Sequence, residues 1–368
     1  SRREVCSIPS KKYWKTRATK RVLRDNMKIA WIWDNGVESP SYYMKKGQAY
    51  NWHTNQPYQK THWVSADCAI AFNNITFLYK EGYFINWMDM YKNNLDLPDL
   101  DLDLILYTCE RNGLDQEWED KFAVKLLRNK YPNAKIIGMI KEIGNNFTGY
   151  VHPHRIPKRF EFLNKCDGIL INKIDDTISE VKEIQKHVSY KIDTSYPIQN
   201  IDTFYDKFYS NEKENCIFAY LPNRTRSIGR TYDFAKYISN KYNLELRTKP
   251  KGQDFYQLSC KDFINLWSPC MYHFNLDPEE TQPGHQCIQV ANAGCINIGG
   301  NNESHKILFP ETATLDENIL EERFVDYLNN PEKRFQVLQS AWNNLNKYYS
   351  FNNARTRLEQ LYKVSYES

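Results

Sequence analysis

Long hydrophobic runs are missing from this chain of 368 residues. No apolar stretch approaches the roughly 18 residues that a helix needs to cross a bilayer, so we predict no transmembrane segment. Hydrophobic residues nevertheless make up 41% of the chain. This share and the chain length suffice for two domains of ordinary size, each with its own core. The sequence therefore predicts a globular protein.

Closely spaced cysteine pairs are missing as well. The nine cysteines are an odd number and occur singly, whereas a structural zinc site takes its ligands from close pairs. Several of them lie inside apolar runs, which indicates buried thiols. Asp99, Asp101 and Asp103 have a spacing that can hold a metal, but they precede a predicted strand. We expect no disulfide framework, no metal site and no cofactor.

A large net charge is also missing, since the formal value is +4. The distribution is uneven, however: residues 1–24 have nine basic side chains and one acidic one, a local charge of +8, and the remaining residues carry −4. We predict a basic N-terminal arm, residues 1–26, suited to nucleic acid or an anionic membrane surface. A solvated extension is the alternative. The arm lacks the apolar core of roughly 7 to 15 residues of a signal peptide, and we expect a cytoplasmic protein.

What the chain does contain is an alternation of short apolar runs with amphipathic segments, in two sets. In the first set, strands are predicted at 27–33, 102–107, 134–140 and 167–172, with helices at 116–130 and 159–164. In the second set, strands are predicted at 216–220, 244–247 and 271–275, with helices at 232–241, 261–267 and 317–361. Strands separated by helices imply largely parallel sheets. We therefore predict an α/β protein with domains at 27–195 and 214–345, followed by a C-terminal helix at 346–368 that crosses back to the first domain.

The segment from Pro283 to Gly300 is the most informative part of the second set. A Pro-Gly break precedes about ten residues of helix-compatible sequence, then a stop at Ala293-Gly294 and a short apolar run that ends in two glycines. This order predicts loop, helix, strand and loop. A helix that begins at a glycine turn has free backbone N–H groups, which bind phosphates or hydroxyls. We expect a nucleotide ligand here.

The chain resembles the glycosyltransferases with two Rossmann-like domains, called GT-B, over residues 27–361. In retaining members of that superfamily an acidic residue, a glycine turn, a second Glu followed by Ala-x-Ala-x-Gly, and an apolar strand follow one another. The matching residues here are Glu279, Glu280, Gly284, Gln289, Ala291, Ala293, Gly294 and the strand 295–298. The resemblance implies two Rossmann-like domains that face a central cleft, with C-terminal helices and the basic N-terminal arm as additions.

The resemblance further implies a nucleotide-sugar donor, and specifically a UDP-sugar, in the second domain. In the family the second Glu binds the ribose hydroxyls; Gln289 stands at its position and can accept one hydrogen bond and donate another, without charge. Three arginines near a predicted helix start suit the diphosphate, and Lys249 is expected near the base. The predicted donor-binding residues are Arg224, Arg226, Arg230, Lys249, Glu279, Glu280, Gly284, His285, Gln286 and Gln289.

The first domain is expected to supply the acceptor side and the catalytic groups. Asp34 ends the first predicted strand, and His152 and His154 follow the strand at 134–140. A histidine is a candidate base if the reaction inverts the sugar, although in a Pro-containing loop it can simply be exposed. Aromatic rings stack on sugars and on bases. The predicted acceptor-binding residues are Asn35, Tyr42, Tyr43, Trp52 and His53.

Three functions are compatible with these residues. The first is a hexosyl- or pentosyltransferase that moves a sugar from a UDP-sugar to a glycan. The second is a phage-type DNA glycosyltransferase acting on hydroxymethylated bases in the host cytoplasm, which the basic arm, the aromatic segment and the Lys-, Asn-, Tyr- and Ile-rich composition favour. The third is an inactive carbohydrate- or nucleic-acid-binding protein of the same fold, for which Gln289 is the argument.

Overall fold

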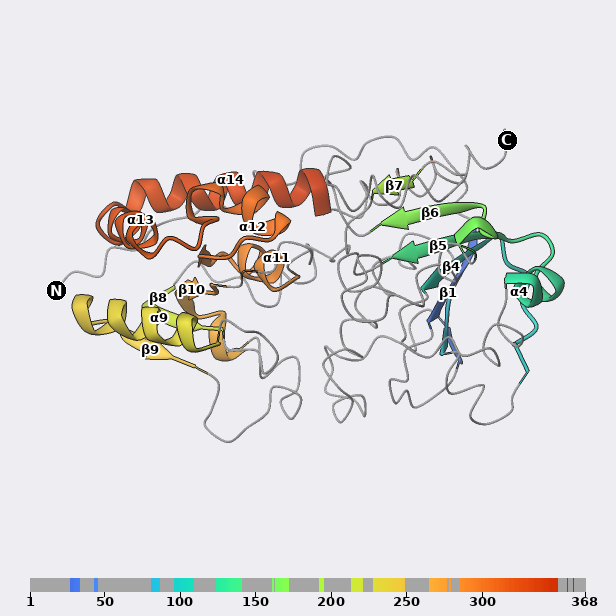
Figure 1. Cartoon of the computed structure of the whole chain (residues 1–368), viewed down its shortest axis with the longest axis horizontal. Coiled ribbons are helices and arrows are strands. Elements are labelled where there is room, and N and C mark those ends of the chain that lie inside the picture. Colours follow the sequence, from blue (N-terminus) through green and yellow to red (C-terminus); the bar gives the residue numbers. More distant parts are fainter. Residues whose placement is uncertain are drawn as a thin grey trace. The chain divides into compact units, whose positions relative to one another are not determined.

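The chain divides into two compact α/β units, one with the strands between residues 27 and 194 and one with those between 213 and 347 (Figure 1). The computed structural model describes residues 27–33, 43–45, 81–86, 96–108, 124–140, 161, 163–171, 192–194, 213–220, 228–248, 265–276, 278, 285–349, 356 and 360. Helices long and apolar enough to span a membrane are absent from these residues.

The first unit is built on a seven-stranded sheet with the strand order β2-β3-β1-β4-β5-β6-β7. Every neighbouring pair is parallel except β2 and β3, which are antiparallel. The strands are β1 (Lys28–Trp33), β2 (Tyr43–Lys45), β3 (Glu81–Asn86), β4 (Leu104–Thr108), β5 (Lys135–Ile140), β6 (Gly168–Ile171) and β7 (Ile192–Thr194), and one helix is α4 (Val124–Lys130). The largely parallel sheet is as predicted.

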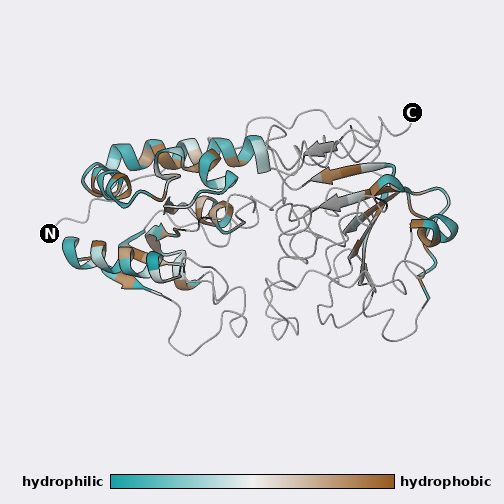
Figure 2. Ribbon diagram, viewed as in Figure 1, coloured by the Kyte–Doolittle hydropathy of each residue, from teal (hydrophilic) through white to brown (hydrophobic). Residues whose placement is uncertain are grey.

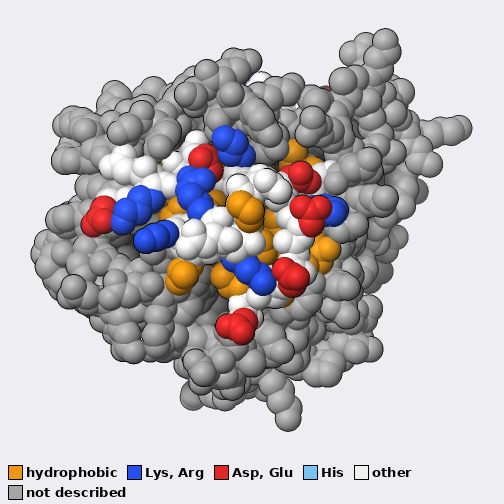
Figure 3. Space-filling view, turned by 90° about the vertical axis from the view of Figure 1, so that its right-hand side faces the viewer, with side chains coloured by type: hydrophobic (Ala, Val, Ile, Leu, Met, Phe, Trp, Pro, Cys, Tyr) orange, Lys and Arg blue, Asp and Glu red, His pale blue; other side chains and the backbone are white. Residues whose placement is uncertain are grey.

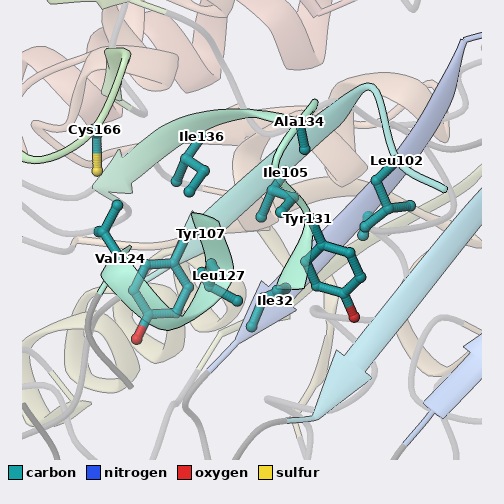
Figure 4. Packing of buried hydrophobic residues seen from close by; sticks show 11 residues of the cluster. Ile32, Leu102, Ile105, Tyr107, Val124, Leu127, Tyr131, Ala134, Ile136 and Cys166 are labelled. Carbon is teal, nitrogen blue, oxygen red and sulfur yellow. The ribbon is translucent and has the colours of Figure 1, made fainter. Parts of the chain in front are cut away.

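One core of the first unit lies between this sheet and α4 (Figure 4). Ile105 and Tyr107 are two residues apart on β4 and therefore point to the same face, where Val124 and Leu127 of α4 meet them. Their i, i+3 spacing places both helix side chains on one stripe. Each fully buried side chain of this kind contributes about 2 kcal/mol to folding, and this packing sets the position of α4.

The strand starts of the first unit are fixed by aspartates. The backbone N–H of Lys28 donates to Asp103 and that of Ile136 to Asp167, each at 2.8 Å, and Arg128 of α4 donates to Asp167 at 3.0 Å.

On the face seen in Figure 3, Lys and Arg side chains are interspersed with Asp, Glu and hydrophobic ones.

The second unit is built on a four-stranded parallel sheet with the order β11-β10-β8-β9. The strands are β8 (Glu214–Ala219), β9 (Glu245–Arg247), β10 (Cys270–Phe274) and β11 (Ile296–Ile298). The helices are α9 (Ile228–Tyr242), α11 (His285–Asn292), α12 (Glu303–Leu308), the 3-10 turn η6 (Pro310–Thr312), α13 (Glu317–Asn329) and α14 (Pro331–Tyr349). The helix, the strand and the turn after it that are predicted within Pro283–Gly300 are confirmed by α11, β11 and Gly299-Gly300, whereas Pro283 and Gly284 lie outside the described residues.

Helices pack on both faces of the second sheet, because side chains of β10 alternate between them. Phe274 packs on Phe234 of α9 and on Phe324 of α13, with ring centroids 5.7 Å apart in both pairs. Asn275 and His273, on the opposite face, contact α11 through Gln286. Hydrophilic and hydrophobic residues alternate along α9, α13 and α14 (Figure 2), as expected for helices with one buried side.

Candidate functional site

The candidate site lies at the carboxyl ends of the strands of the second sheet, the edge where open α/β sheets bind ligands. Backbone hydrogen bonds continue beyond the strands at this edge. Asn275 N–H donates to the carbonyl of Ile298 at 3.0 Å, and Gly299 N–H donates to the carbonyl of Thr312 at 3.1 Å. The loops that leave β10 and β11 are therefore held in place where a ligand would approach.

Gln286 fixes the first turn of α11 to β10. Its Oε1 accepts a hydrogen bond from the side-chain amide of Asn275 at 2.9 Å, and its Nε2 lies 2.8 Å from each ring nitrogen of His273. An amide N–H requires an acceptor, so the imidazole of His273 is neutral here. Burial, together with the nearby His305, lowers the pKa of His273 well below its ordinary value. The backbone N–H groups at the start of α11 are thus rigidly placed.

Gly299 and Gly300 form the turn after β11, and only glycine suits it. Their φ angles are +94° and +96°, in the region that residues with a Cβ rarely adopt. A Cβ on Gly300 would lie 1.8 Å from Nδ1 of His305, and one on Gly299 would lie 3.0 Å from the carbonyl oxygen of Asn275. Both glycines are buried, and the absence of side chains lets the turn pack closely on Asn275, Leu276 and His305.

His305 is buried beneath Gly300. Its backbone N–H donates to Oδ1 of Asn302, the residue that caps α12, at 3.2 Å. The side chain is 0% exposed, and burial lowers its pKa to about 3. Among the described residues neither ring nitrogen has a hydrogen-bond partner. The imidazole is therefore neutral and acts as a packing support for the glycine turn.

Gln289 lies one turn after Gln286 on α11 and is 3% exposed. It stands at the position of the ribose-binding glutamate in the resemblance found in the sequence. Its amide carries both a donor and an acceptor, and its role in donor binding stays a prediction.

Arg230 is exposed on α9 and is held by the start of α13. Its Nε donates to Glu317 at 2.9 Å and its Nη2 to the carbonyl of Leu315 at 2.5 Å. It lines a surface groove of about 690 Å³ together with Asp233, Tyr237 and other residues of the two helices. A phosphate would have to replace the Glu317 carboxylate here, and the role of Arg230 in donor binding stays a prediction.

Most other predicted site residues lie outside the described residues. These are Asp34, Asn35, Tyr42, Trp52, His53, His152, His154, Arg224, Arg226, Lys249, Glu279, Glu280 and Gly284. For Tyr43 and His285 the backbone is described: they are the first residues of β2 and of α11. Among the predicted residues, the described part of the chain thus brings His285, Gln286 and Gln289 together on one helix.

Sequence reasoning missed three residues of the site: His273, Asn275 and His305. Alternation along the predicted strand 271–275 places the first two on one face, and this signal was available. No sequence signal predicted the contact of His305 with Gly300, because this contact depends on the packing of α12. Among the described residues, no cluster of His, Cys, Asp and Glu is suited to hold a metal ion.

Comparison with known proteins finds similarity in structure alone: no family model and no curated protein sequence matches the chain. An α-glucosyltransferase solved with UDP-glucose and DNA containing an abasic site matches with a TM-score of 0.57 and 10% identity, over 92% of this chain and 99% of that one. An α-glucosyltransferase solved with UDP and a 13-mer DNA gives the same TM-score and identity, over 92% of this chain and 100% of that one.

Two further matches are to longer proteins. The GtfA/B complex matches with a TM-score of 0.50 and 12% identity, over 78% of this chain and 62% of that one. A mutant of TarM from S. aureus matches with a TM-score of 0.48 and 15% identity, over 70% of this chain and 55% of that one. The chain thus spans less than two thirds of the length of these two.

At these identities the shared property is the fold, and it agrees with the resemblance found in the sequence. Each unit carries a sheet that is wholly or largely parallel, with helices, as in a Rossmann-like domain. The central cleft between the two domains stays a prediction. In its fold, the chain is similar to the α-glucosyltransferases solved with UDP-glucose or UDP and DNA.

Proposed function

We propose that this protein is a glycosyltransferase that takes a sugar from a UDP-sugar bound at the carboxyl edge of the second sheet. The observation that carries the proposal is the end-to-end match with an α-glucosyltransferase solved with UDP-glucose, over 92% of this chain and 99% of that one. Because a fold does not name a reaction, the residues at the strand ends must also suit a nucleotide.

The first turn of α11 is suited to the diphosphate. The N–H groups at a helix start are unpaired within the helix and attract anions, and here Gln286 holds that start against Asn275 and His273. The turn at Gly299 and Gly300 follows β11 at the same edge of the sheet, and it is held in place by close packing on Asn275 and His305. The start of α11 and the glycine turn would then lie on two sides of a phosphate group.

Gln289 is suited to the ribose. Its amide carries both a donor and an acceptor, which match two neighbouring hydroxyls, and it lies one turn after Gln286 on α11. Unlike a glutamate, it remains neutral at every pH, so ribose binding through it would not titrate.

For the acceptor we propose duplex DNA. The α-glucosyltransferases that match this chain from end to end were solved with DNA, and residues 1–24 carry a local charge of +8. A polycation next to a duplex gains affinity by releasing counterions. A glycan acceptor, the first expectation from the sequence, becomes the competing outcome of the assay.

The assay supplies UDP-glucose with one of three acceptors: duplex DNA with hydroxymethylated cytosines, the same duplex with unmodified cytosines, or an oligosaccharide. We expect release of UDP and glucose transfer only with the hydroxymethylated duplex. Transfer to the oligosaccharide alone would contradict a DNA acceptor. If calorimetry detects no binding of UDP or UDP-glucose, the glycosyltransferase proposal itself is wrong.

A variant without residues 1–26 should lose most of the salt dependence of DNA binding.

Gln289→Leu should weaken UDP binding about 10- to 100-fold, since two hydrogen bonds of about 1 kcal/mol each are lost. Leucine is similar in size and apolar, so the helix should still pack. Calorimetry with UDP and with 2′-deoxy-UDP separates the causes: the wild type should prefer UDP, and the variant should bind both alike. Gln339→Leu, at an exposed position of α14, is the matched control. A variant that keeps the preference for UDP would show that Gln289 does not bind the ribose.

A further inference from the structure

Two buried thiols meet at the amino edge of the second sheet, away from the candidate donor site. Cys216 lies on β8 and Cys270 is the first residue of the neighbouring strand β10; they are 2% and 0% exposed. Cys270 pairs with Glu214 and Tyr272 with Ile217, so β8 has one extra residue over this interval. Cys216 lies within that irregular interval, on the strand next to Cys270.

A guanidinium lies beside the two thiols. Nη1 of Arg247, on β9, is 4.0 Å from Sγ of Cys270, and the same side chain pairs with Glu245 at 2.7 Å and with Glu214. A cation next to a thiol pair stabilises the thiolate that reacts with oxidants. The thiols are thus placed beside a fixed positive charge that reaches the surface.

The two thiols differ in acidity. The hydrogen bond from Cys270, and then the charge of Arg247, lower the pKa of Cys216 against the opposing effect of burial. The same hydrogen bond and burial raise the pKa of Cys270. Burial raises the pKa of the other described cysteines, Cys166, Cys287 and Cys295. Cys216 and Cys270 thus titrate as a pair beside a cation, in which one thiolate can attack an oxidant and the other thiol can resolve the product.

We propose that Cys216 and Cys270 are a reversible redox pair, which a peroxide closes to a disulfide between β8 and β10. The Cys216 thiolate attacks one oxygen of the peroxide; the O–O bond breaks, hydroxide leaves, and Cys216 becomes a sulfenic acid. The sulfur of Cys270 then attacks that of Cys216, and the second hydroxide leaves with the Cys270 proton as water. Two thiols are oxidised and one peroxide is reduced to two waters; an added dithiol reverses the reaction.

The competing thiol is Cys295, which is also near Cys216. Its S–H donates to the carbonyl of Ser268 at 3.4 Å, and its pKa is raised by burial. It is therefore held as a neutral donor. The redox pair uses residues at the edge opposite to the donor site, and it does not depend on the proposed glycosyltransferase activity.

The test treats the folded full-length protein with a small excess of hydrogen peroxide, blocks the remaining thiols with N-ethylmaleimide and digests it without reductant. Chymotrypsin separates the cysteines, since cleavage after Trp267 and Tyr272 isolates Cys270 from Cys287 and Cys295. Mass spectrometry should find one linked pair of fragments, with Cys216 and Cys270, which disappears after treatment with a dithiol.

Four variants give the test its controls. Cys216→Ser and Cys270→Ser should each abolish the linked fragment, whereas Cys287→Ser should keep it. Arg247→Gln should slow its formation several-fold, because each unit by which the pKa of Cys216 rises lowers the thiolate fraction about tenfold. A link from Cys216 to Cys295, or no link in wild-type protein that circular dichroism shows to be folded, would overturn the proposal.

Discussion

Gly300→Ala is expected to destabilise the second unit by about 3 kcal/mol or more, and to abolish UDP binding. Two costs add. The φ angle of +96° is a strained conformation for alanine, and the new methyl would overlap Nδ1 of His305, which lies 1.8 Å from the Cβ position. Hydrogen exchange of the strands β10 and β11, measured by mass spectrometry, reports the stability of this unit, and calorimetry reports UDP binding.

Gly229→Ala is the matched control. It lies in the first turn of α9, and nothing stands within 4 Å of its Cβ position. Alanine is the better helix former, so a gain of about 0.5–1 kcal/mol is expected. Combining Gly300→Ala with His305→Ala separates the two costs: the double variant should be less destabilised than the sum of the single ones, by the cost of the overlap. Strict additivity would show that His305 does not oppose the new methyl.

The strands of both sheets were largely predictable, because most of them are apolar runs bounded by turn residues. The runs at 104–108, 135–140 and 214–219 are strands in the structure, and parallel pairing follows from the helices between them. Three strands, β2, β3 and β7, were not predicted. β2 and β7 have three residues each and β3 has polar ends, so they show too little periodicity to be recognised.

The site was predictable only where it follows from local sequence. The start of α11 at His285 and its end before Gly294 follow from the glycine and proline turns around it. The pairing of Arg230 with Glu317 joins residues 87 positions apart, and the position of Arg230 next to a helix start suggested a phosphate ligand instead. Long-range pairs of this kind are set by the packing of α9 on α13, which sequence periodicity does not specify.

The second unit should also lose stability as the pH falls from 7 to 5, by about 2 kcal/mol for each of His273 and His305. Burial lowers the pKa of both imidazoles, that of His305 to about 3. Below the ordinary histidine pKa of about 6.5, the unfolded chain therefore binds protons that the folded unit does not take up. Stability consequently rises with pH in this range. The stability that the two neutral histidines contribute is complete above about pH 7. It begins to be lost as the pH falls to the histidine pKa of the unfolded chain.

His305→Gln tests this origin of the acid sensitivity, since glutamine does not titrate and is also uncharged. In urea denaturation followed by circular dichroism at several pH values, the variant should lose about half of the difference in unfolding free energy between pH 7 and pH 5. His152→Gln, in the predicted Pro-containing loop, should keep all of it. NMR of the imidazole ring provides the direct check: the His305 signal should not titrate above about pH 5. A His305 that titrates near pH 6.5 in the folded protein would mean that its ring reaches water, and the support that it gives to Gly300 would then have to come from other residues.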